Sequence, residues 1–91
     1  MPRPVNKIAA EIDTALRDLQ RNTRQSWIAH VRPYVNVMLE MDNFDQWYGI
    51  DRGTDIGLRF LSNAQPWRGE QARRIKSEIQ QLIKEAQNVP H

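Results

Sequence analysis

The hydrophobic residues in the last quarter of the chain recur at steps of three and four residues. Neither Pro nor Gly interrupts this spacing after residue 69, so it predicts an amphipathic helix over residues 69–87. The side chains expected to face the core are Ala72, Ile75, Ile79, Leu82 and Ala86.

The polar residues of this predicted helix separate into two strips. At about 100° per residue, one strip covers about 80° of arc and contains no acid. Its members are Arg73, Lys76, Gln80, Lys84 and Gln87. The second strip has mixed charge and consists of Arg74, Glu78, Gln81 and Glu85. A core face next to a basic face indicates binding rather than catalysis.

The same periodicity predicts two helices in the first half of the chain, over residues 5–21 and 26–41. The second contains Pro33, which removes a backbone hydrogen bond and clashes with the preceding turn. We therefore expect either a kink near residues 29–32 or two shorter helices that meet there.

Another helix is predicted over residues 54–63, with Ile56, Phe60 and Leu61 facing inward. The alternation of Ile56, Leu58 and Phe60 leaves a strand open, although a lone strand would have no partner. Gly57 lies inside this helix, and we expect it to allow another helix to approach closely. The fold class is therefore all-α, with a single domain over residues 1–91. It is an irregular bundle of about four helices, the second kinked at its proline.

Residues 42–53 lack helical spacing and contain two glycines. This segment is predicted to be a structured loop or one short helical turn. The apolar residues expected to anchor it to the core are Phe44, Trp47, Tyr48 and Ile50.

The formal net charge of the 91-residue chain is only +2, but its charges are unevenly distributed. Residues 1–34 and 58–91 each contain six Lys or Arg and three acids, whereas residues 35–57 contain one Arg and five acids. We expect the acidic middle mainly to complement the basic ends within the fold; the alternative is two oppositely charged surfaces for different partners.

The acids of the middle segment do not match a metal site. Counting from Asp42, the positions where a calcium-binding loop needs acids hold Phe44 and Gln46, and the position that needs Gly holds Trp47. Asp51 and Asp55 are expected to cap the following helix and to complement its positive N-terminus instead. No metal and no cofactor is therefore predicted.

The sequence offers no catalytic set. Only His30 and the last residue, His91, carry imidazoles, and there is no Cys, phosphate-binding glycine loop or nucleophile elbow. We expect a protein that is not an enzyme. No stretch is apolar enough for a signal peptide or a membrane span, so a cytoplasmic protein without membrane partners is expected.

The most distinctive segment, residues 62–76, clusters Arg and Lys at a helix start beside Trp67. The residues predicted to bind a partner are Arg68, Arg73, Arg74, Lys76 and Lys84. Trp67 itself is expected to fill the core. Each single arginine could instead be solvated and paired with Glu70 or Glu78.

Three parts of the chain together resemble small uncharacterised proteins of bacterial phages and conjugative elements. They are Pro33-Tyr34-Val35 with Met38, the Tyr48 loop with residues 60–64, and Trp67-Arg68-Gly69-Glu70 with residues 72–76. The resemblance covers the last two thirds of the chain and implies a mobile-element context without any mechanism.

The function predicted from this context is stoichiometric protein binding by a mobile-element protein, as an inhibitor or adaptor. Inhibition of a host defence nucleoprotein complex is the concrete version. The alternative is a DNA-binding regulatory or accessory protein that uses the basic face of the last helix. Nucleic-acid binding and homodimerisation both remain open.

Overall fold

Four helices surround one hydrophobic core in the computed structural model, which describes residues 3–87. The helices are α1 (Val5–Asn22), α2 (Ser26–Met38), α3 (Gly53–Asn63) and α4 (Glu70–Gln87). Between α2 and α3, the antiparallel strands β1 (Trp47–Tyr48) and β2 (Asp51–Arg52) form a hairpin. This order confirms the predicted all-α bundle of about four helices and adds a small sheet that was not predicted.

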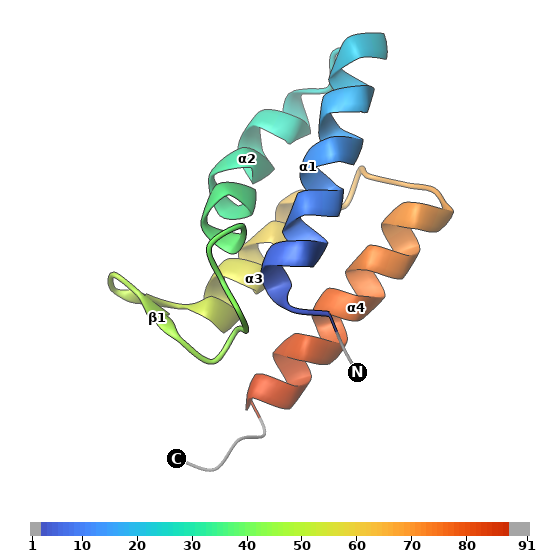
Figure 1. Cartoon of the computed structure of the whole chain (residues 1–91). Coiled ribbons are helices and arrows are strands. Elements are labelled where there is room, and N and C mark those ends of the chain that lie inside the picture. Colours follow the sequence, from blue (N-terminus) through green and yellow to red (C-terminus); the bar gives the residue numbers. More distant parts are fainter. Residues whose placement is uncertain (1–2, 88–91) are drawn as a thin grey trace.

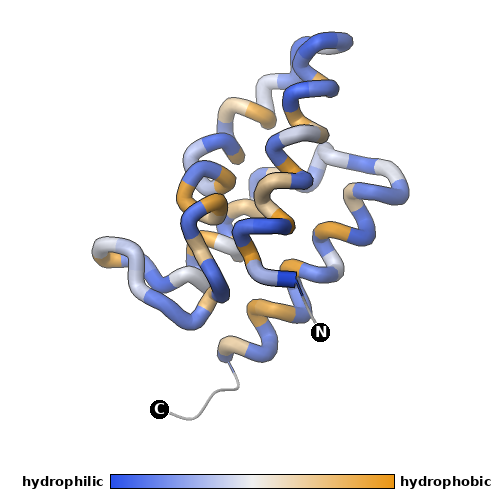
Figure 2. The backbone as a smooth tube through the Cα atoms, viewed as in Figure 1, coloured by the Kyte–Doolittle hydropathy of each residue, from blue (hydrophilic) through white to orange (hydrophobic). Residues whose placement is uncertain are grey.

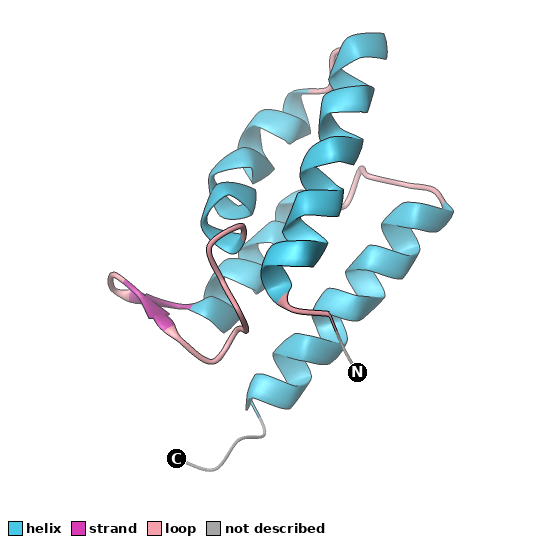
Figure 3. Ribbon diagram, viewed as in Figure 1, coloured by secondary structure: helices cyan, strands magenta, loops and turns pink. Residues whose placement is uncertain are grey.

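The helices pack in a closed arrangement in which α1 and α3 each contact both α2 and α4. Figure 1 shows the hairpin projecting away from α4, beside α2 and α3, and Figure 3 shows it as the only strand pair in the described part of the chain. In Figure 2, hydrophobic and hydrophilic segments alternate along α1 and α4, as the sequence period requires.

α2 continues through Pro33 as a single helix, so the alternative of two separate helices is wrong. The kink expected at this proline stays a prediction. The helix ends at Met38 rather than at residue 41, because the amides of Glu40 and Met41 donate to carbonyls only three residues back. Met41 is nevertheless fully buried. Its hydrophobic side chain therefore continued the helical spacing of the sequence past the residue at which the helix ends.

The start of α1 is held by the segment that follows α2. The amides of Val5 and Asn6 donate to the carbonyls of Asp42 and Met41, at 3.1 and 2.8 Å. The first amides of a helix have no partner within it, so these bonds satisfy two groups that would otherwise need water. They also fix where the chain leaves α2.

Phe44 packs where this segment meets α3 and α4. A Cβ built on Gly53 would lie 2.7 Å from the Phe44 carbonyl oxygen, and one on Gly57 would lie 3.0 Å from the Phe44 ring and 2.9 Å from the Ile83 side chain. Gly57 therefore allows the close approach expected from the sequence. The strand alternative for this region is wrong, since Ile56 and Phe60 are buried within α3.

The buried face of α4 consists of Ala72, Ile75, Ile79, Ile83 and Ala86. Leu82, predicted to face the core, is only half-buried, and Ile83 takes the central place. Leu82 and Ile83 are adjacent in the chain, so either residue fits a hydrophobic face with steps of three and four residues. Contact with Gly57 and Phe44 favours Ile83.

Trp67 is buried, as predicted, and its ring stacks on that of Trp27 with the centroids 6.4 Å apart. Its carbonyl accepts a 2.6 Å hydrogen bond from the ammonium of Lys76. The ring stacking and the hydrogen bond to the Trp67 carbonyl therefore both hold the turn between α3 and α4 in place.

A network of ion pairs joins α1 to α4. Glu11 accepts from Arg3 (2.7 Å), from Arg74 and from Gln71 (3.0 Å), while Glu78 accepts from Arg3 (2.7 Å) and Arg74 (3.1 Å). The hydrogen bond from Arg74, followed by that from Gln71, lowers the pKa of Glu11 from its ordinary 4.5 to about 2. The folded protein therefore holds Glu11 ionised well into acid.

We predict that Trp67→Ala lowers the free energy of unfolding by about 3–5 kcal/mol, since it removes a large buried aromatic ring. Trp47→Ala is the matched control, because that side chain is 67% exposed and should cost less than about 1 kcal/mol. Urea unfolding measures both. Equal decreases in the free energy of unfolding for the two variants would contradict the assignment of Trp67 to the core and of Trp47 to the surface.

We also predict an acid-dependent contribution from Glu11. Because its pKa is lower in the folded protein, its stabilisation is fully present above pH 4.5 and is lost as the pH falls towards 2. Glu11→Gln should therefore be less stable than wild type by about 1 kcal/mol at pH 7, with the difference vanishing near pH 2. Urea unfolding between pH 2 and 7 measures this difference. Asp18→Asn is the control: it removes one partner of an exposed pair with Arg21 and should change the free energy of unfolding at pH 7 by less than about 0.5 kcal/mol.

Candidate binding surfaces

The predicted partner-binding residues occupy different environments on α4 and the turn before it. Arg68, Arg73 and Lys84 are exposed, and none forms an ion pair within the described residues 3–87. Lys76 is half-buried and donates to the Trp67 carbonyl. Burial and the nearby charge of Arg68 lower the pKa of Lys76, which places these two cations close together.

Arg74 lies apart from this group. It binds Glu11 and Glu78 and so faces α1 on the opposite flank of α4. The sequence alternative of an arginine paired with Glu78 is therefore correct for Arg74. Arg68, Arg73, Lys76 and Lys84, together with Gln80 and Gln87, form what we call the α4 basic face.

A second surface is the hairpin tip, defined by Trp47 and Ile50. Trp47 is 67% exposed and Ile50 is 91% exposed, so the expectation that both anchor the segment to the core is wrong. Of the four predicted anchors, Phe44 is fully buried and Tyr48 half-buried. The expectation of a loop or a short helical turn over residues 42–53 is also wrong, because a two-stranded hairpin forms there.

The local sequence explains this hairpin. Trp47 pairs with Arg52 and Tyr48 with Asp51, which leaves Gly49 and Ile50 as a two-residue turn. Gly49 has a φ of 68°, as a type II′ turn requires at its first central position. Below the strands, the Gly53 amide donates to the Gln46 carbonyl at 2.7 Å. The signal in the sequence was a glycine placed between residues with high strand propensity.

Carboxylates surround the base of the hairpin. Asp45 pairs with Arg52 at 2.7 Å, and Asp51 pairs with Arg59 at 3.6 Å. Burial raises the pKa of Tyr48, and the negative charges of Asp42 and Glu40 raise it further. Within residues 3–87, only the Asp51 pair joins the acidic middle block to a basic end. The expectation that this block mainly complements the basic ends within the fold therefore holds for Asp51 alone.

The acids expected to cap α3 and to complement its positive N-terminus do so only in part. Asp55 lies in the first turn of α3, where a negative charge is favourable, but no side chain caps this helix. Asp51 is directed to Arg59 instead. Among residues 3–87, no group of three or more His, Asp or Glu side chains is arranged to hold a metal ion.

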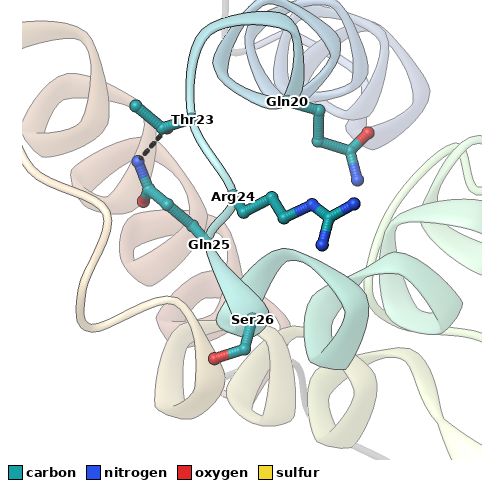
Figure 4. A pocket seen from close by; sticks show the side chains of 5 residues that line it. All are labelled: Gln20, Thr23, Arg24, Gln25 and Ser26. Atoms are coloured by element: carbon teal, nitrogen blue, oxygen red, sulfur yellow. Dashed lines mark hydrogen bonds between the residues drawn. The ribbon is translucent and has the colours of Figure 1, made fainter.

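A pocket of about 490 Å³ lies at the junction of α1 and α2. Its lining consists of Gln20, Thr23, Arg24, Gln25 and Ser26. In Figure 4 the Arg24 and Gln20 side chains point towards each other, and Gln25 bonds to the Thr23 hydroxyl. Among residues 3–87, no acid or imidazole lines this pocket, so none of them is placed there as a general base for Ser26.

A smaller pocket, of about 250 Å³, lies between α4 and the loop that contains Phe44. It brings together two carboxylates, Asp45 and Glu85, but each already accepts a hydrogen bond, from Arg52 and Gln81 respectively. This pocket is on the flank of α4 away from Lys84, so the acidic loop borders the mixed-charge strip and leaves the α4 basic face clear.

Comparison with protein-family models, curated proteins and solved structures gives no match for this chain. Within residues 3–87, no helix combines the length and apolar character needed to cross a membrane. The two surfaces therefore have to be interpreted from their own chemistry.

Proposed function

We propose that this chain is a non-catalytic protein-binding protein, an adaptor or stoichiometric inhibitor, and that the hairpin tip is its main protein contact. The observation that supports this is the exposure of Trp47 and Ile50 at the end of a projecting hairpin, while the other tryptophans, both phenylalanines and most aliphatic residues are buried. Exposing an indole and an isoleucine to water is unfavourable, and a partner that covers them removes that cost.

The chemistry of the tip suits a protein interface. Tryptophan is among the residues most enriched at interface positions that contribute most of the binding energy. The hairpin is also held in place before any partner binds, by the Asp45–Arg52 ion pair and by Phe44 in the core. A preorganised contact loses less conformational entropy on binding than a loose loop does.

The carboxylates at the hairpin base indicate what the partner surface should be like. An apolar pocket that accepts Trp47, bordered by Lys or Arg, would complement both the tip and the acids beside it. The resemblance to phage and conjugative-element proteins suggests a host protein as partner, such as a subunit of a defence nucleoprotein complex.

The test compares two double variants in affinity purification from nuclease-treated lysate of a bacterial host. Trp47→Ala with Ile50→Ser should reduce recovery of the specific partner at least about 10-fold, as expected when contacts of 2 kcal/mol or more are lost. The matched control, Leu39→Ala with Leu58→Ser, removes two other exposed apolar side chains and should keep the partner.

Both variants should unfold in urea close to the wild-type midpoint, since the substituted side chains are exposed. Retention of the same partners at wild-type levels after loss of Trp47 and Ile50 would contradict the proposal. Equal loss in both double variants would do so as well, because it would show nonspecific hydrophobic adhesion.

A further inference from the structure

The described residues contain all thirteen Lys and Arg of the chain, and the ion pairs divide them unevenly. Seven arginines form ion pairs with acids: Arg3, Arg17, Arg21, Arg32, Arg52, Arg59 and Arg74. The six cations that form none within residues 3–87 are Lys7, Arg24, Arg68, Arg73, Lys76 and Lys84. Four of these six belong to the α4 basic face.

This concentration has a structural cause. Glu78 is turned towards α1, where Arg3 and Arg74 bind it, and Glu85 accepts from Gln81 on the same flank. The acids of the last three turns of α4 are thus kept on one side of the helix. On the other side, Arg73 and Lys84 are separated by eleven residues, or about 16 Å along the axis at 1.5 Å per residue.

The α4 basic face contains no apolar residue. Its two remaining members, Gln80 and Gln87, are exposed and polar. Protein–protein interfaces have an apolar core in which charged residues are depleted, whereas protein–DNA interfaces are polar and strongly positive. Lys, Arg and Gln side chains are typical donors to phosphate oxygens. The chemistry of this face therefore differs from that of the hairpin tip.

We propose that the α4 basic face is a contact surface for the phosphate backbone of duplex DNA, independent of the hairpin tip. α4 has 18 residues and is about 27 Å long, and a helix is narrow enough for the B-DNA major groove, which is about 12 Å wide. The major groove of duplex RNA is too deep and narrow for such a fit, which favours DNA. The face consists of Lys, Arg and Gln side chains, which suit phosphate oxygens, so binding is expected to depend on charge rather than on sequence.

The test measures fluorescence anisotropy of a labelled 20-bp DNA duplex titrated with the whole chain at several salt concentrations. With up to four phosphates contacted, log K should fall with log salt at a slope of about −3.6, which is a loss of about 100-fold between 50 and 200 mM salt. Arg73→Gln with Lys84→Gln should reduce the slope to about −1.8 and weaken binding at 50 mM salt.

The charge-matched control is Arg17→Gln with Arg21→Gln, two exposed arginines of α1 that pair with Asp13 and Asp18. It removes the same net charge and should leave the slope and the affinity unchanged. Three results would overturn the proposal: no binding of the duplex by wild type at 50 mM salt, equal weakening by both double variants, or tighter binding of a 20-bp RNA duplex. Trp47→Ala with Ile50→Ser should bind the DNA duplex like wild type, so this test does not depend on the proposed protein contact.

Discussion

The arrangement of the molecule depends on the close contact of Phe44 with two glycines of α3. Its backbone lies against Gly53 and its ring against Gly57, where a side chain on either glycine would collide with it. This contact brings α3 against α4 at Ile83 and fixes the base of the hairpin at the same point. The hairpin tip is consequently anchored to the core through Phe44 rather than attached by a free loop, although the tip side chains Trp47 and Ile50 are themselves exposed.

Ion pairing then determines which charges remain available at the surface. The network of Arg3, Glu11, Arg74 and Glu78 fastens α1 to α4 and takes up acids on one flank of α4. The opposite flank keeps its cations, while the acids around the hairpin have few partners. A chain with a net charge of only +2 therefore presents two surfaces of opposite character, and the chemistry of each suits a different kind of macromolecule.

The sequence predicted those features that depend on local spacing. The regular spacing of hydrophobic residues in α1 and α4 predicted the first and last residues of these helices to within one residue. The arc that contains Arg73 and Lys84 follows from helix geometry alone. What it missed depends on distant contacts. Arg74 is drawn to Glu11, 63 positions away in the chain, and no local pattern encodes that pair. The hairpin was missed because its strands have two residues each, too short for an alternating pattern, and because an aromatic residue such as Trp47 is usually a core residue.

The separation of the hairpin tip from the core has an evolutionary consequence. Ile50 is almost fully exposed, and nothing lies within 4 Å of a Cβ built on Gly49, so the bundle places little steric constraint on the tip. Only Gly49 itself is constrained, by the positive φ that the turn requires. Most substitutions are rejected because they destabilise a fold, and exposed positions largely escape that filter. Side chains at the tip can therefore change while the four-helix scaffold stays the same, which is what the proposed role of the tip as a protein contact would require.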